Sequence, residues 1–297
     1  MTTVELPNPA GGSTVGGSTV IGSLSPSRAS DFKTCPLLYR FRSIDRLPQQ
    51  PTPVATRGTL VHAVLERLFD LPSGERTPEA AAALLEPEWL RLVAAAPELA
   101  ALFADEQELA TWLESARGLL GGYFDLEDPR RLEPAEREQL VEVVLGTGLR
   151  LRGYVDRLDV APTGAIRVVD YKTGAAPREA FEGKALFQLK FYALVLWRTR
   201  GVVPRLLRLM YLGDREVLDY TPEEAELERF ERTLEALWAA IDRATAARDF
   251  RPNPSKLCGW CDHQALCPSF GGTPPPFPVE AAARPATEPP AGPADED

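Results

Sequence analysis

The sequence has no uninterrupted apolar stretch that approaches the length of a membrane span, although 44% of its 297 residues are hydrophobic. A helix needs about 20 mostly apolar residues to cross a bilayer, so a transmembrane protein is excluded. Residues 1–22 have neither a basic start nor a long apolar segment, which argues against a secretory signal. We therefore expect a soluble, cytoplasmic protein with no membrane partner.

Cysteine and histidine are both scarce, with four and two residues in the chain. A chain of this length can bury a large core without disulfides to stabilise it. A reducing compartment also favours metal ligation by thiols over disulfide formation. The four cysteines are therefore candidate metal ligands.

Positive charge is in deficit, with 33 Lys and Arg against 43 Asp and Glu and a formal net charge of −10. On its own this balance disfavours a nucleic-acid partner, because phosphate contacts come from Lys and Arg. The charge is unevenly distributed, however, and residues 24–58 carry six basic and two acidic side chains. Such a patch is compatible with an anionic ligand, although a charge run is more often a solvated surface.

Both ends of the chain have compositions typical of disorder. Residues 1–22 contain few large apolar groups, and residues 271–297 form a Pro/Ala/Glu tract, so neither end can offset the entropy of ordering by burial. We place a single folded domain at residues 23–270. Within it, an Ala/Leu/Glu-rich segment at about 75–130 predicts a helical insertion, in which Pro87 and Pro97 are expected to break helices.

The pattern of the remaining domain alternates between strands and helices. Residues 56–69, 182–200 and 222–248 have helical periodicity, whereas 140–145, 149–160, 166–172, 205–212 and 216–220 read as strands. The first three strands are separated by Gly146-Thr147-Gly148 and Pro162-Thr163-Gly164, which predict hairpin turns. The sequence therefore predicts an α/β fold with a mixed central sheet flanked by helices.

Two of the predicted strands carry acidic residues at corresponding positions. Asp170 and Lys172 share a strand face and Tyr171 points away, while Asp156 on the neighbouring strand can face the same point. Two carboxylates at one end of an apolar sheet suit Mg²⁺ or Mn²⁺, and the lysine is then free to orient a water or stabilise a phosphate. The alternative is that both carboxylates end strands and Lys172 is a surface ion-pair partner.

His62 lies near the start of the predicted helix 56–69. A lone helical histidine is more often a core or boundary residue than a ligand. If this helix packs beside the sheet, the imidazole can complete a metal site with Asp156 and Asp170.

The order GxxxH, GYVDRLD, VVDYKTG and QxxxY resembles the RecB-family branch of the PD-(D/E)xK nuclease superfamily, over roughly Ser25 to Pro268. The resemblance implies a mixed sheet flanked by helices. It further implies that His62, Asp156, Asp170 and the backbone carbonyl of Tyr171 are metal ligands and that Lys172 is the catalytic lysine.

The resemblance also assigns roles to residues outside the acidic strands. Gln188 and Tyr192, four residues apart on one helical face, are implied to position the nucleic acid and the active-site lysine. Their alternative roles are boundary and core packing. We further hypothesise that Tyr39 stacks on a base and that Arg40 and Arg42 contact phosphates, with ordinary packing and solvation as the alternative.

Three cysteines form a compact cluster, Cys258-x2-Cys261-x5-Cys267, and the fourth, Cys35, lies far upstream. Four thiolates fit a [4Fe–4S] cluster or a tetrahedral zinc ion. Because Cys35 and Cys267 each precede a proline, the pattern resembles the iron–sulfur motif of some RecB-like nucleases, including AddB-type recombination nucleases. The alternatives are disulfides or a structural Zn²⁺, with His263 in place of Cys35.

We therefore expect a metal-dependent phosphodiesterase, namely a RecB-like exonuclease acting on single-stranded DNA or DNA ends in repair or recombination. The chain contains no Walker-type phosphate loop, so ATP-driven unwinding would require a helicase or repair-complex partner. The alternatives are a non-catalytic nucleic-acid-binding module and a zinc-bound adaptor.

Overall fold

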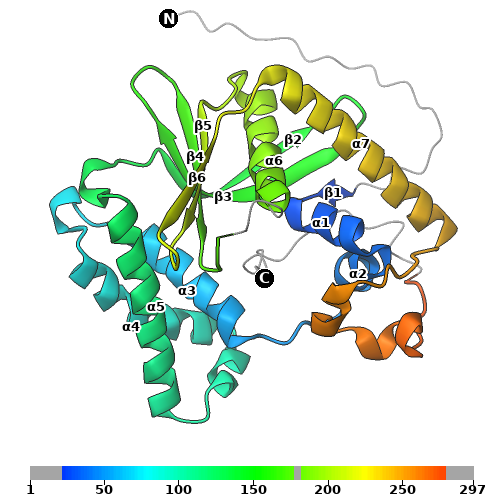
Figure 1. The fold of residues 1–297 in the computed structure, drawn as a ribbon, viewed down its shortest axis with the longest axis horizontal. Coiled ribbons are helices and arrows are strands. Elements are labelled where there is room, and N and C mark those ends of the chain that lie inside the picture. Colours follow the sequence, from blue (N-terminus) through cyan, green and yellow to red (C-terminus); the bar gives the residue numbers. More distant parts are fainter. Residues whose placement is uncertain (1–21, 177–181, 279–297) are drawn as a thin grey trace, which may run out of the picture.

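The computed structural model describes residues 22–176 and 182–278, and a mixed sheet runs through the centre of the molecule (Figure 1). Its six strands are β1 (Ser23–Leu24), β2 (Glu136–Val144), β3 (Arg150–Val160), β4 (Ile166–Lys172), β5 (Leu206–Tyr211) and β6 (Glu216–Tyr220). The strand order is β1-β3-β4-β5-β6, and β2 pairs with β3. The β1–β3 and β4–β5 pairs are parallel and the others antiparallel, so the predicted mixed sheet is confirmed.

The two hairpin turns form where the sequence predicts them. Gly148 has φ of 84° and donates its backbone N–H to the carbonyl of Leu145 at 2.9 Å. Gly164 has φ of 82° and donates to the carbonyl of Ala161 at 2.8 Å. Glycine adopts these left-handed conformations without the steric penalty of a Cβ atom, which explains its position in both turns.

Helices cover both faces of the sheet (Figure 1). One face packs against α1 (Pro26–Thr34), α2 (Pro36–Tyr39), α6 (Glu182–Arg200) and α7 (Glu224–Ala247), and the other against α3 (Pro53–Leu68), α4 (Pro78–Ala95) and α5 (Glu106–Leu126). Strand β4 contributes Val168 to the first core and Val169 and Tyr171 to the second. This alternation directs Asp170 and Lys172 to the same face as Val168.

The helices of the second face begin at well-formed N-caps. The Thr52 hydroxyl accepts from the N–H of Ala55 at 3.2 Å, and Pro53 occupies the first turn, so α3 begins three residues before the predicted start. Pro87 lies inside α4, and the prediction that it breaks a helix is wrong. The flanking Leu85 and Trp89 are both buried in the second core, and this burial outweighs the lost backbone hydrogen bond.

The segment after α7 returns to the region of α2. The rings of Phe250 and Phe277 stack with centroids 6.1 Å apart, and Arg40 donates a hydrogen bond to the carbonyl of Pro275. Residues 271–278, the first part of the predicted tail, thus include Pro275 and Phe277, which contact the domain. The remaining predicted tails, at 1–21 and 279–297, lie outside the described residues. Within the described ranges, no helix combines the length and apolarity that a bilayer crossing requires.

Candidate active site

Strands β3 and β4 separate at the position of the predicted acidic pair. Their ladder runs from Val160 paired with Ile166 to Arg157 paired with Val169, and Asp156 and Asp170 are the next residues beyond it. The Oδ2 atom of Asp156 accepts a hydrogen bond from the backbone N–H of Tyr171 at 2.7 Å. The carboxylate thus takes the place of a ladder partner and bridges the two strands where they diverge.

The point where β3 and β4 diverge, at Asp156 and Asp170, is called the fork below. His62, on α3, reaches it. Its Nε2 atom lies 3.0 Å from the carbonyl oxygen of Tyr171, and its Nδ1 atom lies 3.5 Å from Oδ2 of Asp156. One turn earlier, a Cβ atom on Gly58 would lie 3.2 Å from the hydroxyl of Thr173. The missing side chain therefore lets α3 approach the end of β4, and the imidazole reaches the sheet.

Asp170 and Lys172 form a second group on the opposite face of β4. The ammonium of Lys172 lies 2.8 Å from Oδ2 of Asp170 and donates to Oε1 of Gln188 at 2.9 Å. The Gln188 amide donates to Oδ1 of Asp170 and to the hydroxyl of Tyr192, both at 3.1 Å. Asp170 and Lys172 are only 2% and 8% exposed, so these charged groups depend on one another and on α6.

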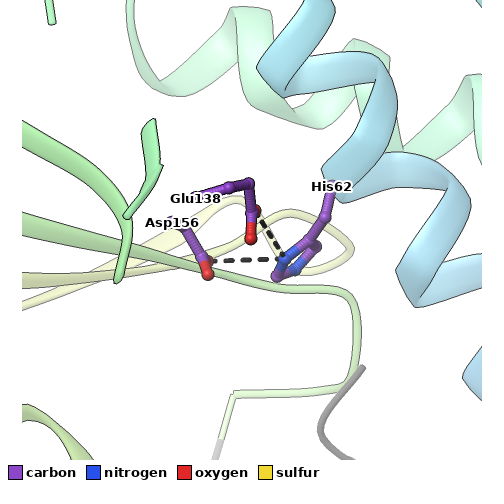
Figure 2. Close-up of side chains that lie close together, drawn as sticks. All are labelled: His62, Glu138 and Asp156. Carbon is purple, nitrogen blue, oxygen red and sulfur yellow. Dashed lines mark ion pairs between the residues drawn. The ribbon is translucent and has the colours of Figure 1, made fainter. Parts of the chain in front are cut away.

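Glu138 is a member of the site that the sequence interpretation missed. Its carboxylate lies beside His62 and Asp156 in Figure 2, and its Oε1 atom is 4.0 Å from Nδ1 of His62. Burial, followed by the negative charge of Asp156, raises the pKa of Glu138 to about 8. Counting back from the predicted β2–β3 turn places Glu138 opposite Asp156, so the hairpin pairing contained the signal.

The structure thus gathers the predicted residues into two linked groups. Ligand atoms of His62, Glu138 and Asp156 lie within 4.8 Å of one another, and no other group of three possible ligands among residues 22–176 and 182–278 is as close. Asp170 is not in this group, because its carboxylate contacts Lys172 and Gln188. The backbone of Tyr171 connects the two groups through its N–H and its carbonyl.

A buried ionic network lies behind the fork. Arg157 is 1% exposed and donates to the hydroxyl of Tyr171 at 2.7 Å and to Oε2 of Glu127 at 3.0 Å, while its Nε atom lies 3.2 Å from Asp159. Burial acts to raise the pKa of Glu127, but the hydrogen bonds and charge of Arg157 outweigh burial and lower it. The network holds the ring of Tyr171 in place through its hydroxyl, while the backbone of Tyr171 contacts Asp156 and His62.

The residues predicted to bind nucleic acid near the N-terminus have structural partners. Tyr39 is 6% exposed, and its ring lies between Phe32 and Phe250, so it has no free face on which a base could stack. Arg40 forms an ion pair with Asp45 at 3.0 Å. Arg42 similarly contacts Asp31 at 3.1 Å. In this conformation the ring of Tyr39 belongs to the core, and base stacking by Tyr39 stays a hypothesis.

The four cysteines are free thiols that line one pocket. The sulfur of Cys35 accepts from the backbone N–H of Asn253, and that of Cys258 from the N–H of Ser255, both at 3.3 Å. Burial raises the pKa of the Cys261 thiol, and the nearby thiols of Cys35 and Cys258 add to this effect. The chain therefore brings the N-terminal and C-terminal cysteines together. His263 is not among the pocket residues, and its ring packs edge-on against Phe41.

Comparison with known proteins agrees with this geometry. The model of the PD-(D/E)XK nuclease superfamily matches residues 23–268. The Gene 69 protein of Mycobacterium phage D29 is 28% identical over 277 residues, which cover 83% of this chain and 96% of that protein. The Gene 69 protein of Mycobacterium phage L5 is 24% identical over 300 residues, which cover 85% of this chain and 98% of that protein.

A solved structure shares the fold. The crystal structure of a "Putative exonuclease" from Eubacterium rectale superposes with a TM-score of 0.53 at 12% identity, and the match covers 92% of this chain and 99% of that chain. At this identity the similarity concerns the arrangement of the sheet and helices alone.

Proposed function

Since the chain belongs to the PD-(D/E)XK nuclease superfamily, we propose that it is a metal-dependent, RecB-like exonuclease acting on single-stranded DNA or DNA ends in repair or recombination. The observation that carries this proposal is the fork of β3 and β4, where His62, Asp156 and the Asp170–Lys172 pair are linked through Tyr171. Cytoplasmic location, and a helicase or repair-complex partner for unwinding duplexes, belong to the same proposal.

The donor atoms at the fork fit a hard divalent cation. His62, Asp156, Asp170 and the carbonyl of Tyr171 would hold Mg²⁺ or Mn²⁺, since carboxylate and carbonyl oxygens are the ligands these ions prefer. When bound, such an ion polarises the phosphate oxygens and lowers the pKa of water.

Lys172 is the residue that would act on the attacking water and on the developing phosphate charge. Its ammonium is held in place by Asp170 and Gln188, so it needs no reorganisation when the reaction begins. Gln188 is in turn held by the hydroxyl of Tyr192, whose ring is buried. Both α6 residues are therefore positioning residues in this proposal.

Cleavage of end-labelled DNA tests the function. The wild-type protein should degrade single-stranded or duplex ends in the presence of Mg²⁺ or Mn²⁺, and EDTA should abolish the reaction. Lys172→Ala should lower the rate by about 100-fold or more, in the range seen for groups that act only in the transition state, whereas Lys190→Ala, whose side chain pairs with Glu226, should not. Binding of DNA without cleavage by pure wild-type protein would instead support a non-catalytic module.

We extend the proposal to a structural [4Fe–4S] cluster held by Cys35, Cys258, Cys261 and Cys267. All four thiols line one pocket and two accept backbone N–H groups, which supports a metal site. Four thiolates fit a [4Fe–4S] cluster, in which each thiolate binds a different iron, and a tetrahedral zinc ion is the alternative.

Iron and sulfide quantitation after anaerobic purification tests the cluster. About four irons per chain are expected, and zinc in their place would favour the structural zinc alternative. Cys261→Ser should lose the metal and lower the melting temperature, because metal binding is coupled to folding. Ser269→Ala, which changes another residue of the same pocket, is the matched control. Unchanged metal content and melting in Cys261→Ser would contradict the assignment.

A further inference from the structure

Strand β2 places a third carboxylate against the site. Register pairs on either side, Arg137 with Arg157 and Gln139 with Val155, set Glu138 directly opposite Asp156. Residues directly opposite each other in an antiparallel pair direct their side chains to the same face. At Glu138 the backbone leaves the extended conformation, with φ of 44°. This conformation is uncommon for a residue other than glycine, and it occurs here in the middle of a strand.

The imidazole of His62 presents an acceptor to both carboxylates. A carbonyl oxygen can only accept a hydrogen bond, so the contact between Nε2 and the oxygen of Tyr171 assigns the proton of the neutral ring to Nε2. The lone pair of Nδ1 then faces Asp156 at 3.5 Å and Glu138 at 4.0 Å (Figure 2). Nδ1 and the two carboxylates therefore offer three ligand atoms that lie within 4.8 Å of one another. A cation is the ligand that suits such a set.

The carboxylate of Asp170 contacts residues outside the group formed by His62, Glu138 and Asp156. Both of its oxygens have cationic or amide partners, Lys172 at 2.8 Å and Gln188 at 3.1 Å. The carboxylate that completes the group around Nδ1 of His62 is therefore the one on β2.

We propose that Glu138 is a direct ligand of the divalent cation, together with His62 and Asp156. The inference rests on the proposed nuclease function for its choice of Mg²⁺ or Mn²⁺, and it adds a ligand from the strand that precedes the acidic motifs.

Mn²⁺ binding in the absence of DNA tests the proposal, with electron paramagnetic resonance of the free ion as the readout. Glu138→Gln should weaken Mn²⁺ binding at least tenfold. Glu142→Gln, an exposed glutamate four residues along the same strand, should stay within twofold of wild type. Binding by Glu138→Gln within twofold of wild type, with Asp156→Asn clearly weakened, overturns the proposal.

Two further measurements keep the test independent of folding and of activity. Glu138→Gly removes the carboxylate at a position whose φ suits glycine, and it should lose Mn²⁺ affinity as Glu138→Gln does. In wild-type crystals soaked in MnCl₂, the anomalous peak should lie about 2.2 Å from a Glu138 oxygen, and a peak beyond reach of this carboxylate contradicts the proposal. Wild-type protein that binds Mn²⁺ through Glu138 but cleaves no DNA would refute the nuclease function alone.

Discussion

The side-chain amide of Gln188 donates a hydrogen bond to Oδ1 of Asp170 over 3.1 Å, so a residue of α6 holds a carboxylate of β4. The same side chain accepts from Lys172, and it therefore fixes both charged groups of the strand at once. Helix α6 thus holds in place the two charged residues that β4 contributes to the fork.

Gln188→Ala should lower kcat by about 10- to 100-fold while leaving KM for DNA nearly unchanged, because residues that orient reacting groups commonly contribute effects of this size. Steady-state cleavage of an end-labelled strand measures both constants. Gln139→Ala, at an exposed position of β2, is the control. A fully active Gln188→Ala protein would show that Lys172 is held in place without the amide.

Gly153→Ala should disturb Tyr192 and, through it, the position of Gln188. A Cβ atom on Gly153 would lie 2.8 Å from the ring of Tyr192, whose hydroxyl holds Gln188. Overpacking of this kind costs about 1–3 kcal/mol, and the displaced ring should also reduce cleavage. Gly118→Ala, where a Cβ atom meets nothing within 4 Å in helix α5, should be neutral or stabilising. Urea unfolding of both variants compares these effects directly, and equal stabilities would contradict the packing argument.

Arg157→Gln should destabilise the protein by about 3–5 kcal/mol, the cost of leaving buried carboxylates without their cation. Glu127 and Asp159 would lose their shared partner, and the hydroxyl of Tyr171 would lose its donor. The double variant Arg157→Gln, Glu127→Gln should recover part of the loss, because one of the uncompensated charges is then removed. Chemical denaturation tests this, and additive losses would indicate that the two residues act independently.

The stability of the metal-free protein should fall as pH rises toward 8. In the folded protein the pKa of Glu138 is raised to about 8, above its value of about 4.3 in an unfolded chain. The folded state therefore binds this proton more tightly, and the resulting stabilisation is complete below about pH 4 and is lost as pH rises through about 8. Melting in EDTA from pH 5 to 9 measures the slope. Glu138→Gln should flatten it, whereas Glu142→Gln should not.

The sequence was informative wherever local patterns determine the structure. The glycine turns fixed the hairpin, and the alternation in Val168-Val169-Asp170-Tyr171-Lys172 determined which side chains share a face. The mixed sheet predicted from these segments is confirmed, and so is the PD-(D/E)XK nuclease superfamily that the sequence motifs resembled. Such features depend on neighbours in the chain, which a sequence displays directly.

Features that depend on tertiary contacts were missed. The strand β2 begins at Glu136, but residues 136–139 are polar, so the apolar pattern predicted a start at 140 and left Glu138 out of the site. Pro87 continues a helix because its neighbours are buried, which local propensity does not reveal. Tyr39 looked like a surface aromatic, yet Phe250, more than two hundred residues later, covers it.

The pocket lined by Cys35 and the three late cysteines also has a consequence for biosynthesis. Residues 258–267 leave the ribosome only after the sheet and α7 have been made. Cys35 is therefore synthesised long before the other three cysteines of the pocket. A nascent chain can form the fork of β3 and β4 first and close this pocket last. Premature termination after α7 would thus release a chain with an assembled fork and an open N-terminal flank, a natural target for cellular proteases.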